Sequence, residues 1–288
     1  MAATGEEVDA ASSPLDRRLA PLLLFDHDGK MADGTQASDG DATLFFFYSI
    51  PSEQLLRNRL AEMEGHRYWT TPQGCLLMQS RTSPATFLWD PFTGARIDLP
   101  ADLDGFLRGD GPKRCLLSSN PVAAACGDQD CLVLVVDLAK TVLWYCRLGI
   151  AGEGDDAGRW LKHEYEPAAA GGAALEVVLW AIRRLTSVGG KFFMILIDSV
   201  VRLDFSPAGP LFAMIPADMN AARWRPPSGG GSTTELVESQ GSLFCVSFSS
   251  SDFHMRFVAG IVVFELNLAT QAWVRSSRVA RWQGVSGS

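Results

Sequence analysis

The sequence contains no Cys-x-x-Cys pair and no apolar run long enough to cross a bilayer. Its strongest apolar runs, such as 44–48 and 132–136, are far shorter than the roughly 20 residues that a membrane-spanning helix needs. Most of the six cysteines lie within apolar segments, which is typical of buried free thiols. These features argue against a zinc site, a disulfide framework and a membrane anchor.

Basic residues are in the minority, because 25 Lys and Arg stand against 33 Asp and Glu, which leaves a formal net charge of −8. Nucleic-acid binding depends on concentrated Lys and Arg, so we do not expect a nucleic-acid partner. The first residues are acidic and lack both the basic and the apolar segment of a secretory signal. We therefore expect an intracellular protein of the cytoplasm or nucleus, with an organelle as the alternative.

Sequence motifs of catalysis are also missing. There is no Gly-x-Ser-x-Gly elbow, and the nearby Ser251, Asp252 and His254 form no recognisable triad, because triads are defined by geometry and not by proximity along the chain. Gly189-Gly190-Lys191 lacks the upstream glycine and the following Ser or Thr of a phosphate loop, so it predicts a tight turn. We expect no enzyme activity, no cofactor and no metal.

The sequence does contain many short apolar runs separated by Gly, Pro, Asp and Asn. With 47% hydrophobic residues over 288 positions, the chain can bury a substantial core and is not a disordered protein. Enrichment of the runs in Val, Phe, Ile and Trp favours strands, so the predicted fold class is all-β. From His66 onward the candidate strands are 66–70, 74–79, 85–90, 113–118, 131–137, 141–148, 160–165, 191–197, 199–205, 233–239, 242–248, 258–266 and 272–279.

The N-terminal region is predicted differently. Residues 1–20 have the composition of a short flexible leader, and two short strands are expected at 22–25 and 43–50. Early acidic and late basic residues over 51–60 favour a short helix. The stretch 173–185 fits either a helix or a strand.

Several hairpins share one plan, in which Asp or Asn opens the turn and a tryptophan lies close to it. Such turns suit Asp and Asn because their side chains accept hydrogen bonds from the backbone two residues further on, while an indole can pack between neighbouring sheets. The predicted turn and core residues are Trp89, Asp90, Pro91, Gly94, Asp137, Trp144, Asn267 and Trp273. A fourth hairpin, over 200–212, lacks the tryptophan. Recurring hairpins of this kind favour a β-propeller of about five blades.

An ordered set of motifs over about residues 66–280 carries a family resemblance. The set is Gly74-Cys-Leu-Leu-Met, Phe87-Leu-Trp-Asp-Pro-Phe-Thr-Gly, Ile97-Asp-Leu-Pro, Cys115-Leu-Leu-Ser-Ser-Asn-Pro, Gly158-Arg-Trp, Gly189-Gly-Lys-Phe-Phe, Leu203-Asp-Phe-Ser-Pro and the 262–273 hairpin. On these residues the chain resembles the plant DUF295 or KIB1-4 β-propeller proteins, which are related to F-box proteins. The resemblance implies a propeller domain over 21–282. Many relatives carry an F-box that docks on a Skp1-type adaptor; no F-box is recognisable here, so that adaptor is not an expected partner.

The resemblance implies a non-catalytic module that presents loop residues to a protein partner, with a link to ubiquitin-ligase substrate recognition. The partner is unidentified. Arg223, Trp224 and Arg225 are the predicted contacts, because Arg and Trp are favoured at binding hot spots and these three lie in a Pro- and Gly-rich loop. The alternative is a small-molecule-binding or enzymatic propeller with a site in its central channel.

Overall fold

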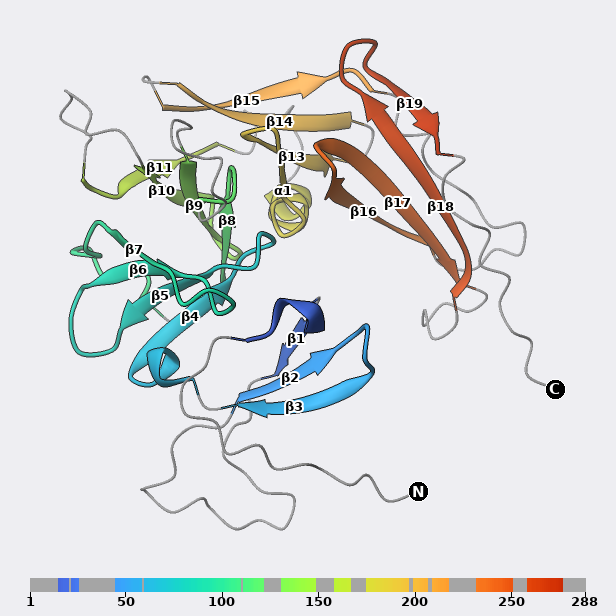
Figure 1. The fold of residues 1–288 in the computed structure, drawn as a ribbon. Helices are drawn as coiled ribbons and strands as arrows, with labels where there is room; N and C mark the ends of the chain where they lie inside the picture. The colour runs from blue at the N-terminus through green and yellow to red at the C-terminus, as the bar shows by residue number, and fades with distance from the viewer. Residues whose placement is uncertain are drawn as a thin grey trace. The chain divides into compact units, whose positions relative to one another are not determined.

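The computed structural model describes most of the chain from Leu15 to Ser276. The described residues are 15–20, 22–25, 45–58, 60–109, 111–121, 131–148, 158–166, 175–196, 199–206, 209–217, 232–250 and 258–276. Their strands form five antiparallel sheets, one of three strands and four of four strands (Figure 1). These five sheets agree with the predicted all-β architecture of about five blades.

The described chain divides into two compact units. The first contains the described residues up to Thr70 together with Gly74–Arg108, and the second contains Thr71–Gln73 and the described residues from Gly109 onward. Within each unit neighbouring strands are also consecutive in sequence, so every sheet is a simple up-and-down meander.

The first unit holds two sheets. Its elements are η1 (Arg17–Leu19), β1 (Leu22–Phe25), β2 (Phe45–Ser49), β3 (Gln54–Asn58), η2 (Ala61–Met63), β4 (His66–Thr70), β5 (Leu76–Ser80), β6 (Thr86–Trp89) and β7 (Arg96–Leu99). Apolar side chains of β2, such as Phe45 and Phe47, share one core cluster with Leu76, Met78 and other residues of the second sheet. The two sheets therefore bury apolar surface against each other.

The second unit holds three sheets and the α-helix. Its elements are β8 (Lys113–Leu117), β9 (Cys131–Asp137), β10 (Val142–Leu148), β11 (Leu161–Glu164), α1 (Leu175–Ile182), β12 (Thr186–Val188), β13 (Lys191–Leu196), β14 (Ser199–Ser206), β15 (Gly209–Ile215), β16 (Ser232–Ser239), β17 (Ser242–Ser250), β18 (Val258–Asn267) and β19 (Ala272–Arg275). One core cluster joins the β8–β11 sheet and α1 to the β12–β15 sheet. A second joins the β12–β15 sheet to the β16–β19 sheet.

Hydrogen bonds also link the first strands of neighbouring sheets in this unit. Gln73 Nε2 donates to the Leu117 carbonyl at the end of β8, at 3.0 Å, and to Ser187 Oγ on β12, at 2.7 Å. The side-chain amide of Gln73 thus links β8 and β12, the first strands of their sheets. This fits a propeller, in which sheets pack face to face around a common centre.

Two segments, 51–60 and 173–185, were candidates for a helix, and only the second contains one. The helix expected over 51–60 is wrong: residues 50–53 form a turn, with Glu53 at φ 54°, and β3 pairs with β2. The stretch over 173–185, which fitted either structure, contains α1. Val178, Ala181 and Ile182 recur at helical spacing and are buried against β13, and this packing favours the helix over a strand.

The described end of the N-terminal segment contacts the first unit. Leu15, inside the predicted 1–20 leader, is only 6% exposed and belongs to the core cluster of the first unit. Its N–H donates to the Pro91 carbonyl at 2.7 Å, and Arg17 Nη2 lies 3.2 Å from Asp90 Oδ2. Residues 15–17 therefore dock on the turn between β6 and β7, a long-range contact that composition alone does not reveal.

Candidate interaction surface

The predicted contact residues Arg223, Trp224 and Arg225 lie outside the described residues, as do Ser251, Asp252 and His254. Their assignments stay predictions. Among the described residues, no group of three His, Cys, Asp or Glu side chains is arranged to hold a metal ion. No described helix is long and apolar enough to cross a membrane.

Gly189 and Gly190 form the turn between β12 and β13, as predicted. Both have positive φ, 55° and 79°, and the strands pair directly on either side, with Val188 opposite Lys191. Two consecutive positive φ values are the requirement of a type I′ hairpin turn, and glycine meets it without strain. The glycines thus connect two strands, with no helix following them as a phosphate loop would need.

Asp90 organises the turn between β6 and β7. Its carboxylate, 4% exposed, accepts hydrogen bonds from the Phe92 N–H at 2.8 Å and from Thr93 Oγ1 at 2.8 Å. Pro91 follows it, and Gly94 closes the turn at φ 72°, donating its N–H to the Asp90 carbonyl. The buried carboxylate is therefore satisfied within the turn and by Arg17.

Asp137 and Asn267 open turns of the same local geometry. Asp137 Oδ1 accepts from the N–H groups of Ala139 and Lys140 at 2.8 and 3.0 Å. Asn267 Oδ1 accepts from the N–H groups two and three residues further on, both at 3.0 Å. The turns are not equivalent in the fold, however. Asp137 joins the second and third strands of its sheet, whereas Asp90 and Asn267 each join the third and fourth.

The three tryptophans of these hairpins also occupy different positions. Trp89, before its turn on a third strand, belongs to the core cluster of the first unit. Trp144 is 7% exposed on a third strand, and Trp273, on a fourth strand, is partly buried against the core cluster between the last two sheets. The shared sequence plan therefore covers two kinds of hairpin, one that joins the second and third strands of a sheet and one that joins the third and fourth. Local sequence similarity did not distinguish them.

The most conspicuous exposed aromatic is on α1. Among the tryptophans that the structure describes, Trp180 alone is exposed, with 48% of its surface accessible, and Leu175 one and a half turns earlier is exposed to the same extent. The opposite face of the helix is buried on β13. In Figure 1 the helix is seen almost end-on beside β13. We call Leu175, Trp180 and Arg184 the α1 surface.

Arg184 holds the indole in place. Its Cζ lies 4.0 Å from the centre of the Trp180 ring, a cation–π arrangement. The same guanidinium donates from Nη1 to Thr233 Oγ1 at 3.2 Å and to the Thr234 carbonyl at 3.0 Å, and it pairs with Glu235 Oε1 at 3.1 Å. Three acceptors on β16 therefore fix the arginine, and the arginine in turn supports the tryptophan.

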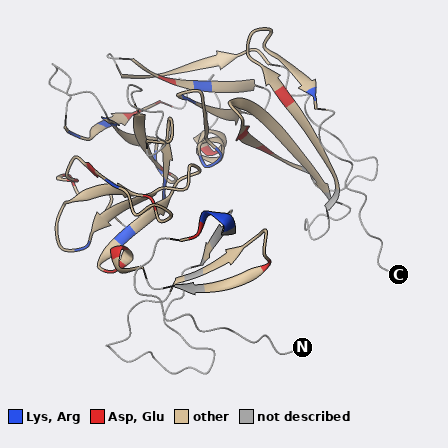
Figure 2. Ribbon diagram, in the orientation of Figure 1, with Lys and Arg blue, Asp and Glu red and all other residues tan. Residues whose placement is uncertain are grey.

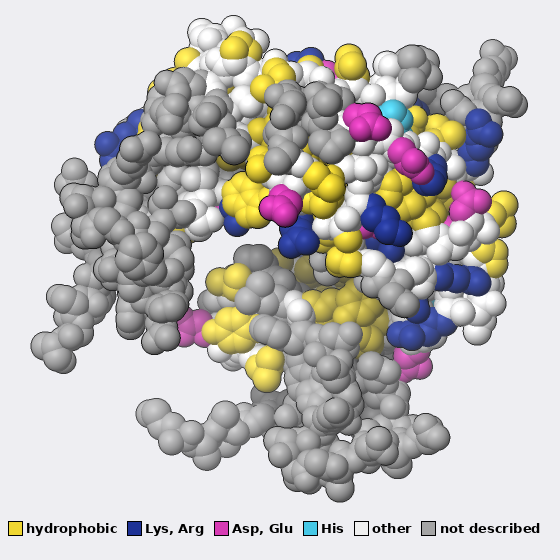
Figure 3. Space-filling view, turned by 180° about the vertical axis from the view of Figure 1, so that it is seen from behind, with side chains coloured by type: hydrophobic (Ala, Val, Ile, Leu, Met, Phe, Trp, Pro, Cys, Tyr) yellow, Lys and Arg dark blue, Asp and Glu magenta, His cyan; other side chains and the backbone are white. Residues whose placement is uncertain are grey.

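Two further arginines lie around this helix end. Arg114 Nη1 on β8 donates to the Arg183 carbonyl, and Arg183 Nη2 donates to the Leu138 carbonyl at 3.2 Å. Burial lowers the pKa of Arg114, and the nearby Glu235 carboxylate partly opposes that shift. In the view from behind, basic and hydrophobic side chains lie next to one another on the molecular surface (Figure 3). Arginine is among the residue types that are enriched at protein–protein interfaces.

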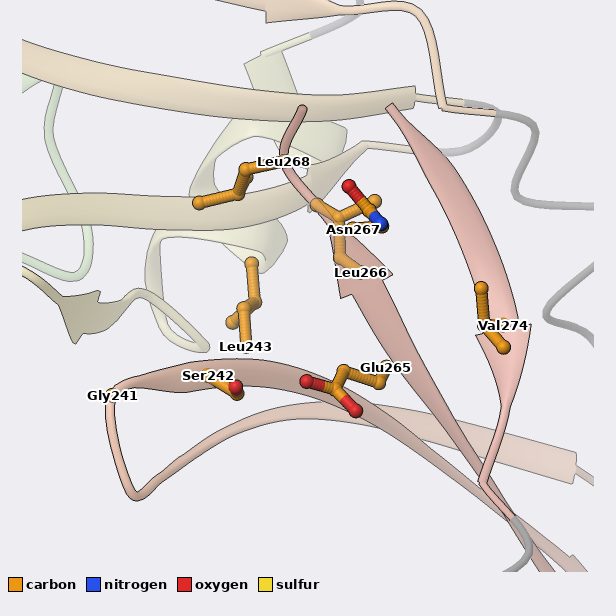
Figure 4. A pocket seen from close by; sticks show the side chains of 8 residues that line it. All are labelled: Gly241, Ser242, Leu243, Glu265, Leu266, Asn267, Leu268 and Val274. Carbon is orange, nitrogen blue, oxygen red and sulfur yellow. The ribbon is translucent and has the colours of Figure 1, made fainter. Parts of the chain in front are cut away.

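A groove of about 430 Å³ lies at the turns of the last sheet (Figure 4). Its residues are Gly241, Ser242, Leu243, Glu265, Leu266, Asn267, Leu268 and Val274. Glu265 is the only charged side chain among them, and the Asn267 amide oxygen is occupied by its own turn. The polar residues of the groove are therefore Ser242, Glu265 and Asn267.

Comparison with known proteins decides the family. The KIB1-4 beta-propeller profile matches residues 47–280, which is most of the chain. The chain belongs to the KIB1-4 beta-propeller family. Both the suspected family and the predicted propeller fold are thereby confirmed. No curated protein matches the chain.

Solved structures similar to this KIB1-4 propeller share little sequence with it. They include the dihydro-heme d1 dehydrogenase NirN (11% identity, TM-score 0.33, 81% of this chain and 42% of that one). Regucalcin, a calcium-binding protein from Agrobacterium tumefaciens, shows 12% identity and a TM-score of 0.34 over 81% of this chain and 66% of its own. The luciferin-regenerating enzyme shows 10% identity and a TM-score of 0.37 over 92% and 74%. The chain spans less than half of NirN, and none of these similarities informs its function.

Sequence reasoning did not select Trp180 or Arg184. The Arg183-Arg184 pair and the nearby tryptophan were visible, but the segment could not be assigned as helix or strand, so no face could be defined. The signal that could have found them is the helical spacing of Val178, Ala181 and Ile182, which are buried and leave Trp180 on the opposite face of α1.

Proposed function

We propose that the protein is a non-catalytic interaction module that binds a protein partner through the α1 surface. The observation that carries this proposal is the exposure of Trp180, 48% accessible and stacked on a fixed Arg184. Tryptophan is highly buried on average, so an indole that stays half exposed while stacked on an arginine fixed by three acceptors supports contact with another molecule.

The physical properties of this pair suit a binding hot spot. Trp and Arg are the side chains that most often dominate the binding free energy of protein–protein interfaces. Because Arg184 is already tied to β16, the indole loses little conformational freedom on binding, and a preorganised contact binds more tightly. Leu175, at the start of the same helix, is also exposed.

The charge of the chain supports a protein partner over a nucleic acid. The net charge is −8, whereas nucleic-acid binding would require a dominant positive surface. Family relatedness to F-box proteins suggests a role in selecting proteins for ubiquitin transfer. The relatedness to F-box proteins bears on which partner is bound, whereas the α1 surface bears on where that partner makes contact.

The proposal is tested by affinity capture with the full chain, followed by measurement with the purified partner. We expect one stoichiometric protein, whose Kd becomes about 30-fold weaker in Trp180→Ala, as for a hot spot worth about 2 kcal/mol. The matched control is Leu103→Ala, since Leu103 is 83% exposed and lies in the first unit. Circular dichroism melts should show both variants folded.

Two results would contradict the proposal. One is partner binding that Trp180→Ala and Leu103→Ala leave equally strong. The other is a small molecule that co-purifies with the chain in native mass spectrometry and is chemically converted by it, which would favour an enzymatic propeller.

A further inference from the structure

Three arginines meet at the end of α1. Arg183 and Arg184 directly follow the helix, and Arg114 on β8 donates from Nη1 to the Arg183 carbonyl. Figure 2 shows basic residues, in blue, where α1 ends. We call these three residues the arginine cluster. A chain with a net charge of −8 thus has a local concentration of positive charge beside the exposed Trp180.

The described acidic residues balance this charge only in part. Among them, Glu235 alone lies within ion-pair distance of the arginine cluster, at 3.1 Å from Arg184, and its charge also acts on Arg114. Asp137, in the turn that Arg183 contacts, is 4% exposed and accepts two backbone N–H bonds of that turn. Three positive charges therefore stand against one accessible carboxylate.

Arg114 has the least favourable surroundings of the three. It is half-buried, its described hydrogen bond goes to a single carbonyl, and burial lowers its pKa. A guanidinium carries five N–H donors, and a charge withdrawn from water is costly unless an opposite charge pairs with it. A carboxylate that approached Arg114 from another molecule would supply the missing charge.

Stabilisation of the helix end does not account for all of this charge. The last carbonyls of a helix need donors, and Arg114 supplies one. The helix dipole favours positive charge at this end, which Arg184 already provides. Arg183 is exposed, and its Nη2 donates to the Leu138 carbonyl, which a neutral donor could serve equally well. Its charge therefore remains available to a ligand.

We propose that the α1 surface and the arginine cluster together bind an acidic segment of the protein partner, in which Asp or Glu side chains flank an apolar one. The inference rests on the proposed function and adds the chemistry of the bound segment. Arg183 follows Trp180 by three residues, a spacing that makes two side chains neighbours at a helix surface. One short segment can therefore pack on the indole and reach a guanidinium.

Charge complementarity selects this occupant. Arginine pairs with a carboxylate through two parallel N–H donors, so the cluster favours acidic side chains and repels basic ones. The half-exposed Trp180 requires an apolar group beside them. A nucleic acid would need a basic surface far larger than three arginines in a chain of net charge −8.

Selection from a displayed library of random peptides on the immobilised full chain tests the chemistry without knowledge of the natural partner. The natural chain should select peptides in which Asp or Glu flank Leu or an aromatic residue. Arg183→Gln should lose the acidic preference, whereas Trp180→Ala should lose the apolar one. The matched control is Arg81→Gln, because Arg81 is also exposed and also donates to one carbonyl, that of His66 at 3.3 Å, but in the first unit.

The affinity of one selected peptide, measured by fluorescence anisotropy, separates charge from shape. Arg183→Gln should raise its Kd about fourfold, as for an exposed ion pair, while Arg183→Lys, which keeps the charge, should raise it less than about twofold. An increase from about 50 to about 500 mM NaCl should weaken binding to the natural chain more than binding to Arg183→Gln, because salt screens the charges. Circular dichroism should show that both variants of this exposed residue are folded.

The outcomes distinguish this inference from the proposed function. Peptides without an acidic preference, no selected peptide at all, or equal binding by Arg183→Gln and the natural chain would overturn the acidic segment. If Trp180→Ala still weakened partner binding, the proposed function would stand. If neither Trp180→Ala nor Arg183→Gln changed any binding, both would be wrong.

Discussion

The β8–β11 sheet and the β16–β19 sheet have the same strand count and the same topology, yet they differ in burial. Every residue of β9 is buried, on both faces of its sheet. In β17 buried residues alternate with half-buried ones, and the β16–β19 sheet also exposes Val237, Ile261 and Val274. No described residue of the β8–β11 sheet is a large exposed hydrophobic.

This difference shows that two sheets of the same topology can be buried to different extents. A sheet buried on both faces carries a nearly continuous apolar strand and gains most of its stability from packing. A sheet buried on one face keeps the alternating pattern and leaves apolar side chains accessible. The two sheets should therefore respond very differently to the same substitution.

The strongest test compares leucine truncations in the two sheets. Leu134 on β9 is fully buried in the core cluster, so Leu134→Ala should lower the free energy of unfolding by about 3 kcal/mol. Leu268, 48% exposed at the turn between β18 and β19, loses little burial, and Leu268→Ala should cost less than about 0.5 kcal/mol. Urea denaturation measures both. Equal losses would show that the burial difference does not govern stability.

A smaller difference is expected between the two turn residues. Asp137→Ala removes a 4% exposed carboxylate that accepts two backbone N–H bonds, and it should cost about 2 kcal/mol because both charge-assisted hydrogen bonds are lost at a buried side chain. Asn267 is exposed, so water can replace its side chain, and Asn267→Ala should cost less than about 1 kcal/mol. Thermal melts of both variants check this order.

Asp137→Asn is the matched control, since an amide keeps the turn acceptor. It should recover much of the stability that Asp137→Ala loses. If the amide were as damaging as alanine, the carboxylate charge and not the turn geometry would be the stabilising feature.

The least pronounced effect concerns pH. Burial raises the pKa of the Cys146 thiol on β10, with a further contribution from Cys131. A thiol in the unfolded chain ionises near pH 8.5, so the folded state is favoured fully below that pH and loses the advantage above it. At pH 9.5 the loss from this one group should be about 1.4 kcal/mol.

Cys146→Ala should therefore flatten the decline of stability between pH 8 and pH 9.5, measured by urea denaturation at each pH. Between pH 6 and pH 7.5 the variant and the natural chain should differ by a constant amount. A decline unchanged by the substitution would mean that Cys146 ionises as easily in the folded chain as in the unfolded one.

Sequence reasoning predicted the strands well, whereas its contact residues Arg223, Trp224 and Arg225 lie outside the described residues and stay a prediction. Strands such as β9 and β10 are recognisable because their apolar runs are uninterrupted and bounded by turn residues. The helix expected over 51–60 was wrong because charge placement there suited a helix, while pairing with β2 made the segment a strand. Secondary structure in short segments depends on the strand with which they pair as well as on local propensity.

The same limit applies to the α1 surface, for which we propose a binding role. The sequence could mark Arg184 as one of a basic pair, but only the packing of α1 on β13 leaves Trp180 at the surface with Arg184 stacked on it. Likewise Arg114 and Arg183 are visible in the sequence as separate basic residues, whereas their meeting at the end of α1 is not.

Local chemistry therefore determined the all-β class and the turns opened by Asp90, Asp137 and Asn267, and the ordered motifs of the sequence indicated the propeller family. Tertiary structure decided which strand became an edge, which hairpins were equivalent and which tryptophan stayed exposed. The physical reason is that turn geometry depends on a few adjacent residues, while exposure depends on everything that packs against a side chain.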